Sequence, residues 1–206
     1  STLATTIAAE PADALQLPPA TGRPTDVLKL IAARRSIRRY AATSLPLQAL
    51  SEVLHAIAHW QAPLLSNAVR IDMVAHAVQG VAPRAWRYDG ATHRLHPRTP
   101  ATDANTLRTQ SRRAALDQDV IGDAAAVFVW SIDRAAWSAD PSGAARGWRH
   151  AFLETGLQGE RLYLAAGALD HELPGREPGL GRDVGVGADE EERGGDEDGG
   201  GCDGPP

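Results

Sequence analysis

The chain has 206 residues, which is enough for one domain of ordinary size with a core that folds unaided. Its apolar fraction of 43% is that of a globular protein, and its formal net charge is −5. Residues 175–206 contain 10 acidic residues and three arginines, so they carry −7 and the remainder carries +2. A nearly neutral body without aromatics between its basic residues argues against nucleic-acid binding, and no apolar run is long enough to predict a membrane span.

The single cysteine, Cys202, excludes a disulfide within the chain. This usage is typical of a reducing compartment, so we expect a cytoplasmic location. No basic-then-apolar leader occurs at the beginning of the sequence, and neither a signal peptide nor a membrane partner is expected.

The first half of the chain predicts an extended arm followed by two helices. Residues 1–24 are punctuated by prolines and predict the arm. A helix is expected from Thr25, with Asp26 near its beginning. A second helix is expected from about Pro46, because apolar residues then recur three and four positions apart. These residues are Leu47, Leu50, Val53, Leu54 and Ile57.

The second half predicts a sheet and a long helix. Ile71–Val78 alternates like a strand, and the segment "AWRYDGATHRLHP" predicts a hairpin that turns at Asp89-Gly90. A polar, exposed helix is expected over Ala101–Gln118, and a central strand over Ala124–Ile132. The long helix is expected over about Ala145–Leu169. Its predicted apolar face consists of Phe152, Leu153, Leu157, Leu162, Ala165, Ala166 and Leu169.

Beyond Asp170 the periodicity stops, and the text becomes rich in glycine, arginine and acidic residues. Such a segment buries too little apolar surface to offset the entropy of ordering, so residues 171–206 predict a disordered tail. The abrupt change of composition is typical of a shifted reading frame in GC-rich DNA. We therefore hypothesise that the original C-terminal part is lost or frameshifted.

The stretch "RRSIRRY", Arg34 to Tyr40, places four arginines within six residues. Arg34 and Arg38 are four residues apart and share one face of a helix, with the hydroxyl of Ser36 between them. Guanidinium groups and short hydroxyls are the donors that a phosphate prefers. A solvated basic turn, whose cations favour the C-terminal end of a helix dipole, explains the same pattern.

The neighbouring text resembles the flavin-dependent nitroreductase family over about residues 25–170. "AARRSIRRYAATSLPLQALSEVLHAIAHWQAP" is similar to the family's opening, an R-R-S-x-R-x-[FY] helix followed by an L-x-x-L-x-x-x-L helix. "RAWRYDGATHRLHPR", "ALDQDVIGDAAAVFVWSID" and "HAFLETGLQGERLYLAAGALD" resemble the hairpin, strand and long helix of SagB-type dehydrogenases, which oxidise azoline rings in modified peptides.

The resemblance implies an α+β fold, a mostly antiparallel sheet between helices, and an FMN-dependent oxidoreductase. By position, Arg34, Arg35, Ser36 and Arg38 correspond to the ligands of the flavin phosphate and ribityl chain. Asn67, in "APLLSNAV", corresponds to an asparagine near the flavin. NAD(P)H is an implied electron donor, and a homodimer with FMN at the subunit interface is the implied assembly.

Several positions depart from the family pattern. Leu64 stands where a serine is usual, and no P-W follows the asparagine. The long helix reads "GLQGERLYLAA" in place of G-x-x-A-Q-N-L-Y-L-A-A, and the family's glycine-rich segment does not follow it. Two alternatives therefore stay open: a catalytically silent subunit of a peptide-modifying complex, and a domain that binds another phosphorylated ligand.

Nothing in the spacing singles out a catalytic acid or base, although Tyr163 and Glu154 are candidates. His55 and His59 have a zinc-like spacing but lack the glutamate of H-E-x-x-H, so no metal site is expected.

Further residues carry weaker predictions. The histidines His93 and His96 are expected to be exposed, and Trp130, Trp137 and Trp148 to pack in the core or at an interface. Gly156 and Gly159 are expected to permit the close approach of another helix or of the cofactor.

Overall fold

The computed structural model describes residues 13–22, 26–36, 38, 40, 42–59, 65–171 and 184–186. The helices are α1 (Val27–Ala33), α2 (Leu47–Ala58), α3 (Ala104–Ala114), α4 (Asp119–Asp123), α5 (Arg134–Ser138) and α6 (Ala144–His171). The strands are β1 (Leu15–Gln16), β2 (Val69–Ala75), β3 (Arg84–Asp89), β4 (Arg94–Pro97), β5 (Ala126–Ile132) and β6 (Val184–Val186). Among these residues no helix combines the length and apolar character that a membrane span requires.

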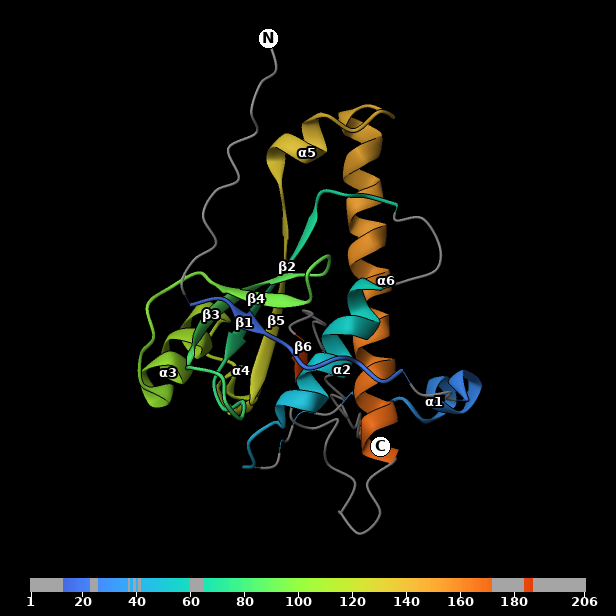
Figure 1. Cartoon of the computed structure of the whole chain (residues 1–206). Coiled ribbons are helices and arrows are strands. Elements are labelled where there is room, and N and C mark those ends of the chain that lie inside the picture. The colour runs from blue at the N-terminus through green and yellow to red at the C-terminus, as the bar shows by residue number, and fades with distance from the viewer. Residues whose placement is uncertain are drawn as a thin grey trace, which may run out of the picture.

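One sheet with the strand order β1-β4-β3-β2-β5-β6 forms the centre of the molecule. Its first five strands are antiparallel, and β6 pairs in parallel with β5. Helices α2 and α6 cover one face, while α3 and α4 lie on the other side (Figure 1). The predicted α+β fold with a mostly antiparallel sheet between helices is therefore confirmed.

The main core lies between the sheet and the helices α2 and α6. The predicted stripe of α2 is buried there, with Leu50, Val53, Leu54 and Ile57 at 0% exposure. Strand β2 contributes Met73 to the same core. Since burial of one such side chain contributes roughly 1.5–3 kcal/mol, this layer dominates the stability of the fold. A smaller cluster on the other face joins Ile121, Ala124 and Val127.

The predicted hairpin is confirmed, because β3 and β4 pair across a turn that begins at Gly90. The predicted helix over 101–118 is shorter. It ends at Ala114 and is followed by Leu116 and Asp117, both with positive φ, before α4 begins. Two left-handed residues in succession interrupt a helix, and the sequence offers no glycine there to announce the break.

Both ends of the chain contribute to the sheet where the sequence predicted none. Leu15–Gln16, within the predicted arm, forms the edge strand β1 against β4. Val184–Val186, within the predicted disordered tail, forms β6 against β5. The text "DVGVG" alternates β-branched valine with glycine, which suits a short strand once an open edge is available. The remainder of the tail lies outside the described residues.

The apolar face predicted for α6 is only partly buried. Leu162 and Ala166 lie in the core, whereas Phe152 and Leu153 are each 58% exposed. In Figure 1 the first half of α6 extends beyond α2, and the short helix α5 packs against its first turns through Trp137 and Trp148. The last residues of β5 are also partly exposed, which the continuous apolar run did not predict.

Candidate functional site

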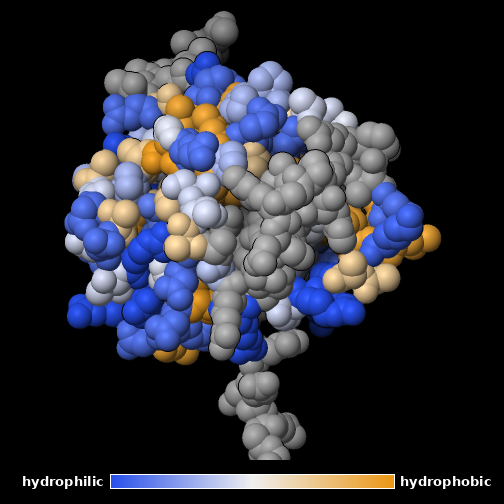
Figure 2. All heavy atoms as spheres, turned by 90° about the horizontal axis from the view of Figure 1, so that it is seen from below, coloured by the Kyte–Doolittle hydropathy of each residue, from blue (hydrophilic) through white to orange (hydrophobic). Residues whose placement is uncertain are grey.

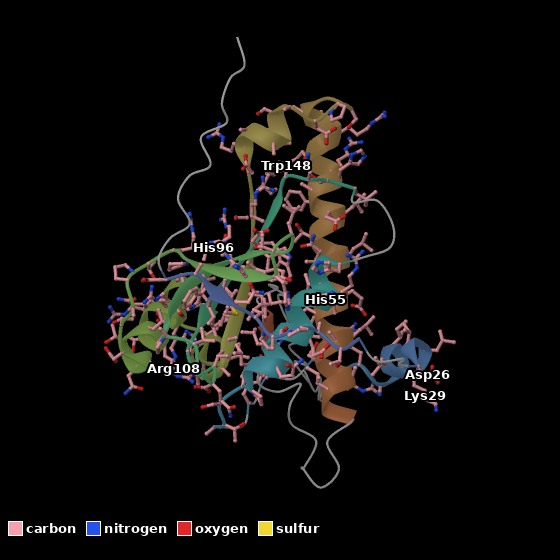
Figure 3. All side chains as sticks on the ribbon, in the orientation of Figure 1. Asp26, Lys29, His55, His96, Arg108 and Trp148 are labelled. Carbon is pink, nitrogen blue, oxygen red and sulfur yellow. The ribbon has the colours of Figure 1, made fainter. Side chains whose placement is uncertain are left out.

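The arginine segment begins where α1 ends. Asp26 caps the helix by accepting the N–H of Lys29, and Arg34 closes it by donating its N–H to the carbonyl of Leu30 at 2.9 Å. Leu30 is the buried residue of α1, and its side chain reaches α6 beside Gly167. Figure 3 shows Asp26 and Lys29 on the outer side of α1, away from the sheet. The segment therefore lies against α6 at the edge of the molecule.

Arg34 contacts two side chains of α6. Its Nε lies 3.6 Å from Oε1 of Glu160, and its guanidinium carbon lies 5.3 Å from the centre of the Tyr163 ring. The side chains of Arg34 and Glu160 are 41% and 46% exposed, so water screens the ion pair strongly. The aromatic ring attracts the cation as well, which holds the guanidinium over α6.

The other predicted ligands are less closely assembled. Arg35 donates to the carbonyls of Ala32 and Arg34 at 3.1 and 2.7 Å, so it binds the C-terminal end of its own helix. Ser36 and Arg38 are exposed. The structure thus places the four predicted phosphate ligands on one short exposed segment, with Arg34 directed at α6.

Asn67 is exposed and lies just before β2. Its carbonyl accepts a hydrogen bond of 2.6 Å from Nη1 of Arg70. The same segment is fixed at Leu65, whose N–H donates to Oε2 of Glu154 at 3.0 Å. The usual serine position, Leu64, lies outside the described residues.

Glu154 is the centre of a buried polar network that links the Asn67 segment to α6. Its side chain is 1% exposed and also accepts from Nε2 of Gln158 at 3.0 Å, with Nη1 of Arg161 3.9 Å away. Gln158 in turn accepts from the indole of Trp130 at 2.8 Å. A buried carboxylate is stable only with such partners. The sequence carries one signal of this buried network: a charged residue, Glu154, stands eight positions before Leu162 on the apolar face of α6.

The residues present fit a flavin phosphate. Three guanidiniums and one hydroxyl lie exposed on one segment, and the exposed ion pair and main-chain contacts that Arg34 and Arg35 make are weak ones that a dianion can displace. Their exposure means that a second surface must cover the ligand to exclude water.

The histidines are arranged differently from the prediction. His93 is hydrogen-bonded through Nδ1 to the hydroxyl of Tyr88 and through Nε2 to that of Ser51, both at 2.7 Å, so its expected exposure was wrong. His55 and His59 stack with ring centres 4.1 Å apart, and His93 lies within 6.4 Å of both. Burial lowers the pKa of His55 most, and the imidazoles of His59 and His93 lower it further. Across the described ranges, no group of three or more metal-ligating side chains could hold a metal ion.

Trp130 packs against the main core as predicted, whereas Trp137 and Trp148 form an apolar cluster at the far end of α6, where Trp148 is 45% exposed. Trp148 packs edge-on to Trp137 with centres 5.4 Å apart and contacts Phe152 at 4.9 Å. A shallow hollow there is lined by Trp148, Arg149, Phe152 and Leu153. Figure 3 places Trp148 next to α5, far along α6 from α1. A second apolar area covers α1 itself at the right edge of Figure 2, where Val27, Leu28 and Ile31 are exposed.

The predicted roles of the α6 glycines find no support in the described part of the chain. A Cβ added at Gly156 or Gly159 would meet nothing within 4 Å there. Of the arginines in α3, Arg108 donates to the carbonyl of Ala124 at 3.0 Å, and Arg112 pairs with Asp119 and Asp123. These two basic residues stabilise the connection of α3 and α4.

Comparison with known proteins identifies the family. The nitroreductase family model matches residues 31–171, so the chain belongs to the nitroreductase family. A proposed nitroreductase from Anabaena variabilis superposes with a TM-score of 0.64 at 20% identity, over 76% of this chain and 34% of that one. A proposed nitroreductase from Ralstonia eutropha gives 0.60 at 21% identity, over 76% and 72%.

These identities establish a common fold and nothing more specific. The chain spans only about a third of the Anabaena protein. A search of curated proteins returned no match.

Proposed function

We propose that the protein is an FMN-dependent oxidoreductase in which Arg34, Arg35, Ser36 and Arg38 bind the phosphate and ribityl chain, with Asn67 beside the flavin ring. The observation that carries this proposal is the guanidinium of Arg34, held over Tyr163 at the end of α1 while its side chain stays 41% exposed. A cation fixed in this way is oriented for an anion and remains accessible to it.

The chain's own contribution is binding and orientation. The arginines neutralise the phosphate, the hydroxyl of Ser36 donates to it, and the Glu154 network fixes the segment that carries Asn67. FMN, when bound, would supply the chemistry of hydride and electron transfer, and these residues would hold and orient it. We infer NAD(P)H as the donor, or an azoline-containing peptide if the protein acts like the SagB-type dehydrogenases.

A homodimer is part of the proposal. Trp148, Phe152, Leu153 and Leu157 are all at least 45% exposed on α6. A contiguous apolar area of this kind is typical of an interface. A second copy would both cover it and supply the surface that excludes water from the arginine segment.

The domain boundaries follow from this function. We assign the flavin-binding unit to residues 25–170, an extended arm to 1–24 and a glycine- and acid-rich tail to 171–206. The single cysteine supports a cytoplasmic location. Resequencing the coding DNA would test the reading-frame hypothesis. If no single-base change that restores the reading frame is found, the hypothesis is excluded.

A catalytically silent subunit of a peptide-modifying complex is the second candidate. It is favoured by Glu160, whose carboxylate contacts the guanidinium that the flavin phosphate requires.

Titration of the purified chain with FMN, followed by quenching of flavin fluorescence, tests the first proposal. We expect saturable binding that weakens at least tenfold in Arg34→Gln, and flavin bleaching by NAD(P)H or by substrate. Binding without bleaching by any donor would favour the silent subunit. Absence of FMN binding would refute both.

A further inference from the structure

We propose that Glu160 is a built-in competitor for Arg34, so that a phosphate monoester binds this arginine only by displacing the carboxylate. The inference rests on the proposed FMN site and concerns how strongly that site binds. It starts from a contact that no function requires: a carboxylate of α6 lies 3.6 Å from Nε of an arginine predicted to bind phosphate.

The carboxylate of Glu160 can leave Arg34, and another anion can take its place there. Glu160 is 46% exposed in the middle of a helix, so its side chain can turn to water without opening any buried contact. The Arg34 guanidinium keeps its contact with the Tyr163 ring, one turn further along α6, whichever anion it binds. The exchange of Glu160 for phosphate is therefore a local event that leaves α1 and α6 in place.

The neighbouring cation cannot relieve the competition. Arg161, next to Glu160 in sequence, is directed at Glu154 and at the carbonyl of Ile57, and its side chain is only 12% exposed. A phosphate on Arg34 thus meets the negative charge of Glu160 directly. Like charges a few ångströms apart in partly exposed positions repel each other.

The charge of Glu160 therefore lowers the affinity for phosphorylated flavin. Removing it both frees Arg34 and abolishes the repulsion. We expect Glu160→Gln to bind FMN about three- to tenfold more tightly at low salt, because an exposed pair contributes up to about 1 kcal/mol. The gain in FMN affinity over wild type should be smaller at 1 M salt, where the electrostatic screening length is about 3 Å.

The experiment titrates wild type and Glu160→Gln with FMN and with riboflavin, which lacks the phosphate. The matched control is Asp117→Asn, which removes one negative charge from the turn between α3 and α4, across the sheet from α1 (Figure 1). We expect a gain for FMN in Glu160→Gln alone, and a change of less than twofold for riboflavin. Glu160→Gln placed in an Arg34→Gln background should give no gain.

Each other outcome decides against the inference. Equal FMN affinity of wild type and Glu160→Gln overturns it and leaves the proposed function intact. An equal gain for riboflavin, in Asp117→Asn, or in the Arg34→Gln background shows that the charge does not act through Arg34 and the phosphate. If neither protein binds FMN, both the inference and the proposed function fail.

Discussion

The N–H of Leu65 donates to Oε2 of Glu154 across 89 residues of sequence, at a distance of 3.0 Å. This bond ties the segment before β2 to the middle of α6, and the carboxylate that accepts it is 1% exposed. We predict that Glu154→Ala lowers the free energy of unfolding by about 2–4 kcal/mol, because it leaves Leu65 N–H and the Gln158 amide without their acceptor and removes the carboxylate that lies 3.9 Å from Arg161.

Urea unfolding followed by circular dichroism measures this loss. The matched control is Glu160→Ala, six residues along the same helix, whose half-exposed carboxylate should contribute less than about 0.5 kcal/mol to stability. Equal effects of the two variants would contradict a structural role for the Glu154 network.

The histidine cluster predicts loss of stability in acid. Burial lowers the pKa of His55, and the imidazoles of His59 and His93 lower it further, against a smaller opposing effect of Glu52. A base whose pKa is lower in the folded than in the unfolded chain binds its proton more readily after unfolding. The free energy of unfolding should therefore fall as the pH drops below the unfolded value of about 6.5, and not change for this reason above it.

Replacing His55 with glutamine should make the slope of stability against pH shallower between pH 7 and pH 5. Thermal unfolding at several pH values measures the slope. At pH 8, where His55 is neutral in both states, any difference between variant and wild type reports packing alone. A wild-type slope that persists unchanged in the variant would exclude His55 as its source.

Leu116 is a position where the chain is less stable than it could be. Its φ is +55° and its side chain is 81% exposed, so it bears left-handed strain without gaining burial. Glycine relieves the clash of Cβ in this region. We predict that Leu116→Gly raises the free energy of unfolding by about 0.5–1 kcal/mol. Leu116→Ala, which keeps Cβ, should give no such gain, and equal stabilisation by both would refute the backbone explanation.

The apolar cluster on α6 predicts a defined change in association. The double variant Phe152→Glu, Leu153→Glu should weaken a dimer at least tenfold, because it places charges in an interface that must exclude water. Sedimentation velocity over a range of concentrations measures this. Each side chain is 58% exposed, so the monomer should lose less than about 0.5 kcal/mol per site.

Leu28→Glu on α1 is the comparison variant, because Leu28 is 78% exposed in the other apolar area. A dimer that survives the α6 changes but dissociates in Leu28→Glu would move the interface to α1. A dimer that survives both would exclude the two areas.

Sequence reasoning was most accurate where local periodicity coincides with burial. The spacing of Leu50, Leu54 and Ile57 identified the buried face of α2, because one face of this helix lies entirely on the sheet. The same reasoning overestimated the buried face of α6. Phe152 and Leu153 continue the apolar pattern, but whether another element covers that stretch depends on the length of α2, which the pattern of α6 does not contain.

The site was predictable only in part for a similar reason. The position of Arg34 at the end of a helix follows from the neighbouring sequence, while its contact with Glu160 joins residues 126 positions apart. His93 was expected at the surface because it lies on a hairpin, but two of its partners, Ser51 and Pro18, lie 42 and 75 residues away. Contacts of this range arise from the tertiary fold and leave no periodic trace in the sequence.

Helix α6 has 28 residues and is therefore about 42 Å long. Trp148 and Glu160, roughly 18 Å apart along its axis, belong to the proposed subunit interface and to the proposed phosphate site. Gly156 and Gly159 lie between them, and each glycine weakens a helix by up to about 1 kcal/mol relative to alanine. A section of low helix propensity thus separates the two proposed sites. Alanine at either glycine, where the added Cβ meets open space, would stabilise the section of helix that sets the spacing of the two proposed sites.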